Sequence, residues 1–114
     1  MDNKITYRVT SNGLVDEDLY EYDLTIYGDE GIPMSWVTYR KDLNRRLIII
    51  GMVGTKQEFR NQGLSKRVLD ILFQGLQKTK WPVCVEAYTA AGEIYIRHVI
   101  ENLAAKYGVR MIKC

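Results

Sequence analysis

The residues with the clearest chemical potential lie in a polar loop that follows a long apolar run. Residues 47–53 are almost entirely apolar, and the segment after the loop carries apolar side chains at helical spacing. Residues 60–65 therefore lie between a buried strand and the start of a helix, where unpaired backbone N–H groups and the helix dipole favour an anion. Gly63 lets the backbone approach a ligand closely, Ser65 adds a hydroxyl donor, and the Arg60 guanidinium can lie over a phosphate.

The same loop carries a family resemblance. The signature of the GNAT (N-acetyltransferase) superfamily, Gln/Arg-x-x-Gly-x-Gly/Ala, is similar to the loop sequence Arg60-Asn61-Gln62-Gly63-Leu64-Ser65. In that family the signature stands between the fourth strand and the following helix, which is the position that the loop holds here. Ser65 replaces the usual glycine or alanine and is still small. The chain is therefore identified as a short member of the GNAT superfamily.

The resemblance implies that the protein binds acetyl-CoA and transfers the acetyl group directly to an amine acceptor. The amides of residues 61–65 would hold the coenzyme A pyrophosphate. In the family the fourth strand and the fifth, here residues 83–88, splay apart, and the acyl thioester lies in the gap between them. The edge of the fourth strand would hydrogen-bond the pantetheine arm, which here assigns this role to Met52, Val53 and Gly54.

Acetyl transfer needs a base that takes a proton from the amine, and an acid can protonate the leaving thiolate. Residues 91–95 resemble the Ala-x-x-Leu-Tyr run after the family's fifth strand, which makes Tyr95 the candidate acid; the alternative is a tyrosine on a helix flank. Glu86 is the candidate base, directly or through water, and its alternative is a solvated glutamate. Tyr107 is a second candidate acid, although its helical spacing favours core packing. The fourth strand offers no carboxylate.

The elements around the loop predict one domain over residues 1–114 with a mixed α/β (α+β) fold. Alternating or continuous apolar patterns predict a mostly antiparallel sheet of about six strands, and two amphipathic stripes predict two main helices. The predicted strands are 5–9, 20–26, 34–40, 47–53, 83–88 and 109–113. The fourth should be buried on both faces because it is a continuous apolar run.

The segment between the first two strands is short. Ser11-Asn12-Gly13 is predicted to end the first strand, and residues 14–19 leave room for about one helical turn. GNAT proteins usually have two helices here that shape the acceptor site. The resemblance therefore implies an acceptor pocket that is truncated, open, or completed by another chain.

Composition narrows the function classes. The 114 residues have a formal net charge of +2, which gives no reason to expect nucleic acid as the partner. Cys84, Cys114 and a single histidine do not make a metal site, and a disulfide between the cysteines stays open. The start has no apolar signal segment, and the longest apolar run is far below the ~20 residues that span a bilayer. We expect a cytoplasmic protein with no membrane contact.

Three hypotheses follow. The first is an acetyl-CoA-dependent N-acetyltransferase, favoured by the loop; its acceptor is a small amine, an antibiotic, a lysine or a protein N-terminus. The second is an inactive GNAT-fold module that binds coenzyme A or a protein partner, favoured by the short N-terminal half. The third is a protein-interaction domain with Trp36 and Tyr39 on its contact surface. A homodimer or a host-protein partner stays open.

Overall fold

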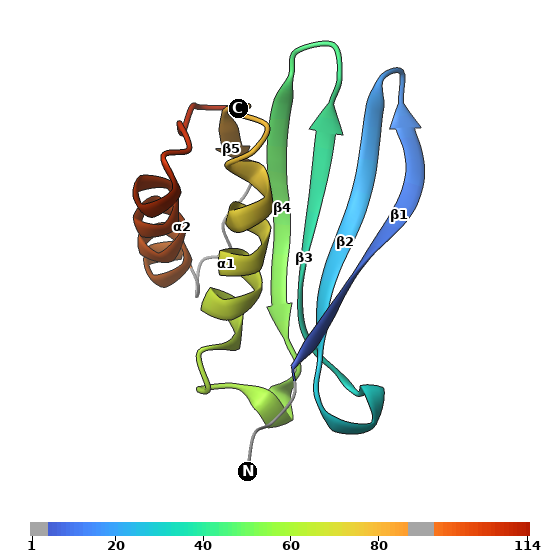
Figure 1. Ribbon diagram of the computed structural model, residues 1–114, viewed down its shortest axis with the longest axis vertical. Coiled ribbons are helices and arrows are strands. Elements are labelled where there is room, and N and C mark those ends of the chain that lie inside the picture. The colour runs from blue at the N-terminus through green and yellow to red at the C-terminus, as the bar shows by residue number, and fades with distance from the viewer. Residues whose placement is uncertain (1–4, 87–92) are drawn as a thin grey trace.

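The computed structural model describes residues 5–86 and 93–114. The sheet has five strands in chain order, and each neighbouring pair is antiparallel except β4 and β5, which run parallel. This antiparallel meander followed by a crossover confirms the predicted mixed α/β (α+β) fold (Figure 1). The strands are β1 (Thr6–Asp16), β2 (Leu19–Tyr27), β3 (Pro33–Asp42), β4 (Leu47–Thr55) and β5 (Val83–Val85).

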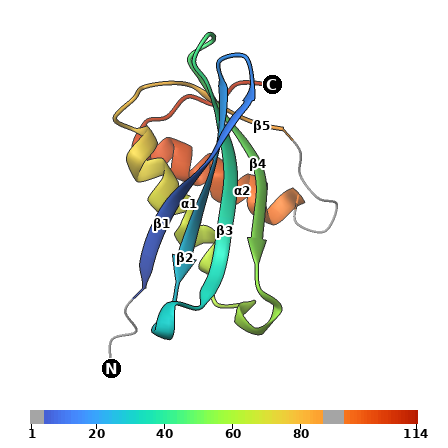
Figure 2. The same cartoon turned by 90° about the vertical axis from the view of Figure 1, so that its right-hand side faces the viewer.

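Two helices cover one face of this sheet. The crossover from β4 to β5 contains α1 (Leu64–Leu76), and α2 (Glu93–Tyr107) follows later in the chain. Figures 1 and 2 show both helices on the same side, while no helix of the described residues covers the other face, which we call the open face. Short 3-10 turns, η1 (Asp29–Gly31) and η2 (Gln57–Phe59), complete the fold. Neither helix combines the length and apolar content that a membrane crossing requires, within the residues described.

The core lies between the sheet and the two helices, as the apolar spacing predicts. From the predicted stripe of α1, Leu64, Val68, Leu72 and Leu76 are buried, because residues three or four apart share one helix face. Gly108 has a φ of 67° immediately after α2, so it ends that helix in the left-handed conformation that glycine adopts without steric cost. The buried side chains that meet the helices from the strands include Leu24, Ile26, Val37, Ile48 and Ile50.

The first strand is longer than predicted. It continues through Gly13 to Asp16 and pairs with β2 along its whole length, so the predicted break at residues 11–13 and the helical turn at 14–19 are both wrong. Register shifts between Ser11 and Gly13 and between Leu14 and Asp16 accommodate the turn-forming residues as bulges. Pairing with a long neighbouring strand thus overrides the local preference of this segment for a turn.

The apolar side chains of β1 are also more exposed than a half-buried strand predicts. Tyr7 is 60% exposed and Val9 is 48% exposed, although both pair with core residues of β2. The reason is the position of α1, which packs on β2, β3 and β4 and leaves the outer strand β1 uncovered.

The predicted sixth strand does not form. Met111 makes a single parallel bridge to Val83, supported by hydrogen bonds from Val83 N–H to the Arg110 oxygen (2.8 Å) and from Ile112 N–H to the Val83 oxygen (2.9 Å). Because β5 is only three residues long, it offers too little edge for a regular ladder. Cys84 and Cys114 form a disulfide with their Cα atoms 5.2 Å apart, which settles the pairing that the sequence left open.

Candidate active site

The polar loop connects β4 to α1 as predicted. It passes through η2 and ends at Gly63, the N-cap of α1. Asn61 and Gly63 have left-handed φ values of 65° and 71°, which turn the chain into the helix within a short distance. Glycine adopts this region freely, and asparagine is among the residues that tolerate it best.

The start of α1 presents a run of unpaired backbone donors. The first helical hydrogen bond runs from the Arg67 N–H to the Gly63 carbonyl oxygen at 3.1 Å, and no side chain caps the helix. Within the part of the chain that the structure describes, the N–H groups of residues 61–66 have no acceptor. Arg60 is exposed beside them and forms no ion pair with a described residue. N–H groups at the positive end of a helix form a site for an anion.

A chain of hydroxyl groups fixes the start of α1 to the sheet. The buried Ser35 hydroxyl donates to the Gly54 carbonyl oxygen at 2.7 Å, and its oxygen lies 2.9 Å from Thr55 Oγ1. Thr55 Oγ1 in turn lies 2.9 Å from Ser65 Oγ. Since each hydroxyl has one proton, Thr55 donates to Ser35 and Ser65 donates to Thr55. The Ser65 hydroxyl therefore holds the helix in place, and its backbone N–H is the group left for a ligand.

Among the described residues, the edge of β4 that faces β5 has no partner strand over its second half, and we call this part the open edge. The two strands pair only at Ile48, Ile49 and Ile50, and the last link is a 2.9 Å hydrogen bond from the Glu86 N–H to the Ile50 oxygen. Beyond that point β4 continues to Thr55, paired with β3 on its other edge but with no described strand on the edge toward β5. The described ladder between β4 and β5 therefore ends at Ile50, and the predicted splay of the two strands falls on residues 87–88, outside the described residues.

A bulge changes the direction of β4 at the same place. Val37 pairs with Val53 and Tyr39 pairs with Ile50, so β4 has one more residue than β3 in this stretch. Met52 lies in the bulge and is 65% exposed, which corrects the prediction that this strand is buried on both faces. The first half of β4 lies under the helices, while the second half leaves the core.

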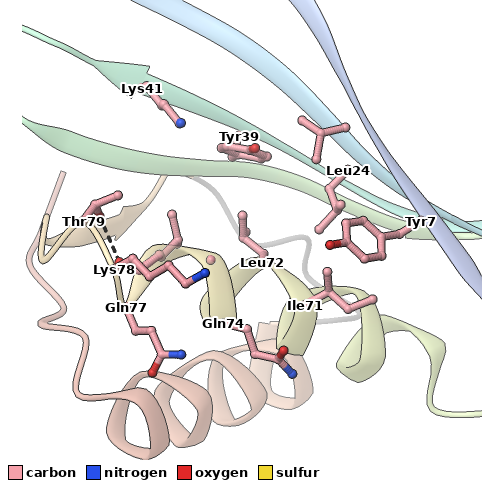
Figure 3. Close-up of a pocket in the computed structure, with 13 residues that line it drawn as sticks. Tyr7, Leu24, Tyr39, Lys41, Ile71, Leu72, Gln74, Gln77, Lys78 and Thr79 are labelled. Atoms are coloured by element: carbon pink, nitrogen blue, oxygen red, sulfur yellow. Dashed lines mark hydrogen bonds between the residues drawn. The ribbon is translucent and has the colours of Figure 1, made fainter.

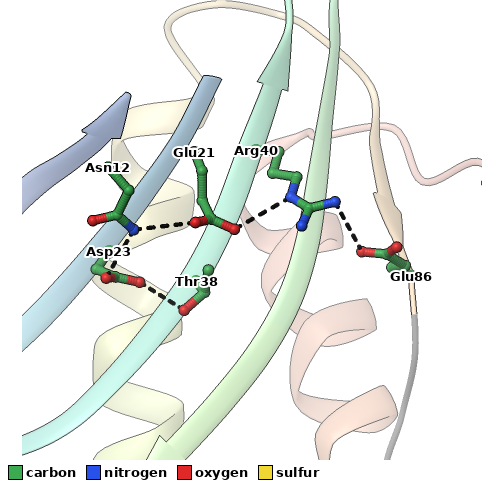
Figure 4. Close-up of polar contacts among 6 residues, drawn as sticks. All are labelled: Asn12, Glu21, Asp23, Thr38, Arg40 and Glu86. Atoms are coloured by element: carbon green, nitrogen blue, oxygen red, sulfur yellow. Dashed lines mark hydrogen bonds and ion pairs between the residues drawn. The ribbon is translucent and has the colours of Figure 1, made fainter. Parts of the chain in front are cut away.

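Polar side chains form a row on the open face of the sheet, from β1 to the residue after β5 (Figure 4). Arg40 Nε lies 3.3 Å from Glu21 Oε1, and its Nη1 lies 3.9 Å from Glu86 Oε2. Farther along the row, the Thr38 hydroxyl donates to Asp23 at 2.6 Å, and Asn12 donates to the same carboxylate at 3.0 Å. The Glu86 side chain is 54% exposed, so Glu86 is both solvated and held near the point where β4 and β5 part.

Comparison with solved structures identifies the architecture. The chain superimposes on Tetrahymena GCN5 with a TM-score of 0.62 and 12% identity, over 74% of this chain and 51% of that one. It superimposes on a ribosomal-protein-alanine N-acetyltransferase from Brucella melitensis with a TM-score of 0.60 and 11% identity, over 90% of both chains. The chain has the GNAT fold. A third match, aminoglycoside N-acetyltransferase AAC(6')-Iy in complex with CoA, has a TM-score of 0.60 and 9% identity, over 96% of this chain and 90% of that one.

The likeness is one of fold and not of sequence. No protein-family model matches the chain, and a search of curated protein sequences finds no significant match. The chain spans about half the length of the Tetrahymena structure and 90% of the other two. The predicted GNAT-like fold is confirmed, with five strands in place of about six.

The GNAT fold brings some of the predicted site residues together. Arg60, the N–H groups of residues 61–65 and the open edge at Met52, Val53 and Gly54 lie along one path from β4 to α1. Tyr95 belongs to α2, but its side chain lies outside the described residues. Tyr107, the second candidate acid, has its hydroxyl in a different contact: it donates a hydrogen bond to Asp70 of α1 at 2.6 Å.

Sequence reasoning missed two features of the site. The hydroxyl chain joins Ser35, Thr55 and Ser65 from three elements, and the Arg40 side chain joins carboxylates from two others. The strand register supplies the missing signal, because it places Ser35 opposite Thr55 and Glu21 opposite Arg40. That register depends on bulges in the strands that the sequence pattern did not locate.

Proposed function

We propose that this protein is an N-acetyltransferase that uses acetyl-CoA and an amine acceptor. The observation that carries the proposal is the run of unpaired N–H groups at residues 61–66, directly beside the open edge of β4. A diphosphate needs several donors in a small space, and a helix start that follows a strand supplies them. The GNAT fold of the chain supports the same reading, since the matched structures include named acetyltransferases.

The residues present fit coenzyme A. The N–H groups of residues 61–65 and the Arg60 guanidinium would hold the pyrophosphate, and the backbone of Met52, Val53 and Gly54 would bond the amide groups of the pantetheine arm. When bound, acetyl-CoA supplies an acetyl group activated as a thioester. The hydroxyl chain from Ser35 to Ser65 keeps the two binding elements in a fixed relation, which reduces the ordering that binding requires.

Glu86 remains our candidate for the base that takes the proton of the amine. It lies where β5 leaves β4, its carboxylate is partly exposed, and Arg40 positions it from the open face. An exposed carboxylate beside the gap is accessible to an amine or to a bridging water. Tyr95 remains our candidate for the acid that protonates the thiolate.

Thermal unfolding with and without acetyl-CoA tests the cofactor site. Ligand at 100 times its dissociation constant stabilises a folded protein by about 2.7 kcal/mol, which raises the midpoint of a domain of this size by roughly ten degrees. We expect this rise in the wild type and a much smaller one in Arg60→Glu. Arg110→Glu makes the same charge change at another exposed arginine and should keep the full rise. No rise in the wild type, or equal rises in all three proteins, would contradict the site.

A second candidate function is a GNAT-fold module that binds coenzyme A or a protein partner without catalysis. The observation that favours it is the lack of any carboxylate on β4, which leaves Glu86 as the only acid that we place at the gap. Release of free thiol from acetyl-CoA in the presence of a panel of amines separates the two functions. Turnover that falls in Glu86→Gln supports the enzyme, while cofactor binding without turnover of any amine supports the module.

A further inference from the structure

A groove lies on the helix face of the sheet, between the uncovered strand β1 and the C-terminal half of α1 (Figure 3). Its volume is about 560 Å³, within the range of small-molecule sites. The cofactor loop lies before the opposite end of α1, so the two sites are distinct. Its lining is part apolar and part polar. Tyr7, Val9, Leu24, Tyr39, Ile71 and Leu72 supply much of the apolar surface, and the polar side chains are Lys41, Gln74, Gln77, Lys78 and Thr79.

Tyr39 is an unpartnered polar group in this wall. The residue is only 6% exposed, and its hydroxyl forms no hydrogen bond with a described residue. Every fully buried side-chain oxygen or nitrogen among the described residues has a hydrogen-bond partner. Since the Tyr39 hydroxyl has none, it is not fully buried, and we infer that it is exposed to the groove that Tyr39 lines. Burial, together with the neighbouring Tyr22, raises the pKa of Tyr39 to about 12. The hydroxyl therefore keeps its proton at neutral pH and can donate it to a ligand.

Among the described residues, the charged side chains that line the groove are all of one sign. They are Lys41 and Lys78; no carboxylate of a described residue lines the groove, and neither lysine forms an ion pair with a described residue. Lys41 Nζ lies 5.1 Å from the centre of the Tyr22 ring. Figure 3 shows both lysines toward one end of the groove and Tyr7 and Ile71 toward the other. The groove is thus cationic at one end and apolar at the other.

We propose that this groove binds an amphipathic carboxylate: a molecule with an apolar body and one carboxylate group. The carboxylate lies at the end with Lys41 and Lys78 and accepts the hydrogen bond of Tyr39. The apolar body covers Leu24, Ile71 and the exposed face of β1. Such a ligand pairs two lysines that form no ion pair with a described residue, and it buries apolar surface that α1 leaves uncovered. This site is additional to the proposed acetyltransferase site and does not depend on it.

Titration calorimetry with decanoate tests the proposal. We expect saturable binding to the wild type at one site, weakened about tenfold or more in Lys41→Gln/Lys78→Gln, because two charge-assisted contacts are lost. Tyr39→Phe should weaken binding by a smaller factor. Lys66→Gln/Lys113→Gln removes two exposed lysines outside the groove and should bind decanoate as the wild type does. Amide NMR shifts of residues 71–79 locate the bound decanoate.

Decanol, which has the same apolar chain without the charge, is the matched ligand. Weaker binding of decanol than of decanoate supports the proposal, and equal binding overturns it because the charges then play no part. The proposal is also overturned if decanoate does not saturate, or if the control double variant loses as much affinity as the groove variant. The groove would instead be assigned to a second copy of the chain by two results together: the protein forms a stable dimer that Val9→Glu dissociates, and decanoate does not bind to that dimer. All these readouts are independent of coenzyme A binding.

Discussion

At the scale of single residues, Gly54 is the position in β4 where the structure tolerates no side chain. A β-carbon at Gly54 would lie 2.6 Å from Cε2 and Cζ2 of Trp36 and 2.8 Å from its Nε1. These distances are below any van der Waals contact, so the indole must lie directly on the strand backbone. Trp36 and Gly54 also pair across β3 and β4. The tryptophan therefore covers the strand segment to which we assign the pantetheine arm.

Gly54→Ala should lower the free energy of unfolding by about 1–3 kcal/mol, the usual cost of forcing an added methyl into a packed position. Urea unfolding measures this loss. In the Trp36→Ala background the same substitution should cost little, because the indole is gone. Gly75→Ala is the matched control: its β-carbon meets nothing within 4 Å, and alanine should stabilise the helix by about 0.5–1 kcal/mol. An unfolding midpoint for Gly54→Ala equal to that of the wild type would show that the indole does not rest on this backbone.

The residues whose position in the fold could be predicted are those with a local environment. Arg60 and Gly63 follow from the order strand, loop and helix, which can be read within a short stretch of chain. Arg40 was missed because its role comes from contacts with Glu21 on β2 and with Glu86, the residue after β5. A side chain that acts across strands becomes visible only when the register is known.

At the scale of elements, a small polar cluster joins the two helices. The Tyr107 hydroxyl donates to Asp70 Oδ1 at 2.6 Å, Gln74 Nε2 donates to Oδ2 at 3.0 Å, and Lys106 Nζ lies 3.6 Å from Oδ1. Burial acts to raise the pKa of Asp70, but these hydrogen bonds and the lysine charge outweigh it and hold the pKa below its ordinary value. Asp70 is therefore more acidic in the folded protein than in the unfolded chain.

Because the folded pKa of Asp70 is lowered, its contribution to stability is present above the unfolded value of about 3.9 and is lost as the pH falls through the folded value. Tyr107→Phe should cost about 1 kcal/mol of unfolding free energy at pH 7, and the difference from the wild type should shrink in acid. Urea unfolding across a pH series measures it. Tyr20→Phe is the control, since its hydroxyl has no partner among the described residues. A Tyr107→Phe difference that stays constant below pH 4 would contradict the role of the carboxylate.

Elements with a strong internal period were predictable, and those shaped by their neighbours were not. The apolar stripe of α1 indicates a helix whatever it packs against. Residues 11–16 include turn-forming residues but belong to β1, because they form backbone hydrogen bonds with the long neighbouring strand β2. Residues 109–113 have a strand-like composition but meet only the short β5, so just one bridge forms.

At the scale of the whole molecule, the resemblance of residues 60–65 to the GNAT signature predicted the fold, but how much of the sheet the helices cover could not be predicted. How far α1 reaches across the strands depends on packing against α2 and on the crossover, neither of which has a sequence signal. That reach leaves β1 uncovered and creates the groove beside Tyr7 and Val9. The end of the chain is likewise held by few backbone contacts, and the disulfide from Cys114 to Cys84 is its main anchor to β5.

Cys114→Ser should therefore lower the free energy of unfolding of the oxidised protein by about 2–4 kcal/mol, the usual effect of a disulfide that closes a loop of intermediate length. The cysteines are 30 residues apart, and the cross-link restricts the unfolded chain as well as holding the C-terminal segment. Serine at exposed position 114 leaves buried Cys84 and the core unchanged.

Urea unfolding with and without a reducing agent measures the effect of the disulfide. The reduced wild type should have the same unfolding free energy as Cys114→Ser, and the variant itself should not respond to the reducing agent. A wild-type unfolding curve that reduction leaves unchanged would show that the bond does not stabilise the fold.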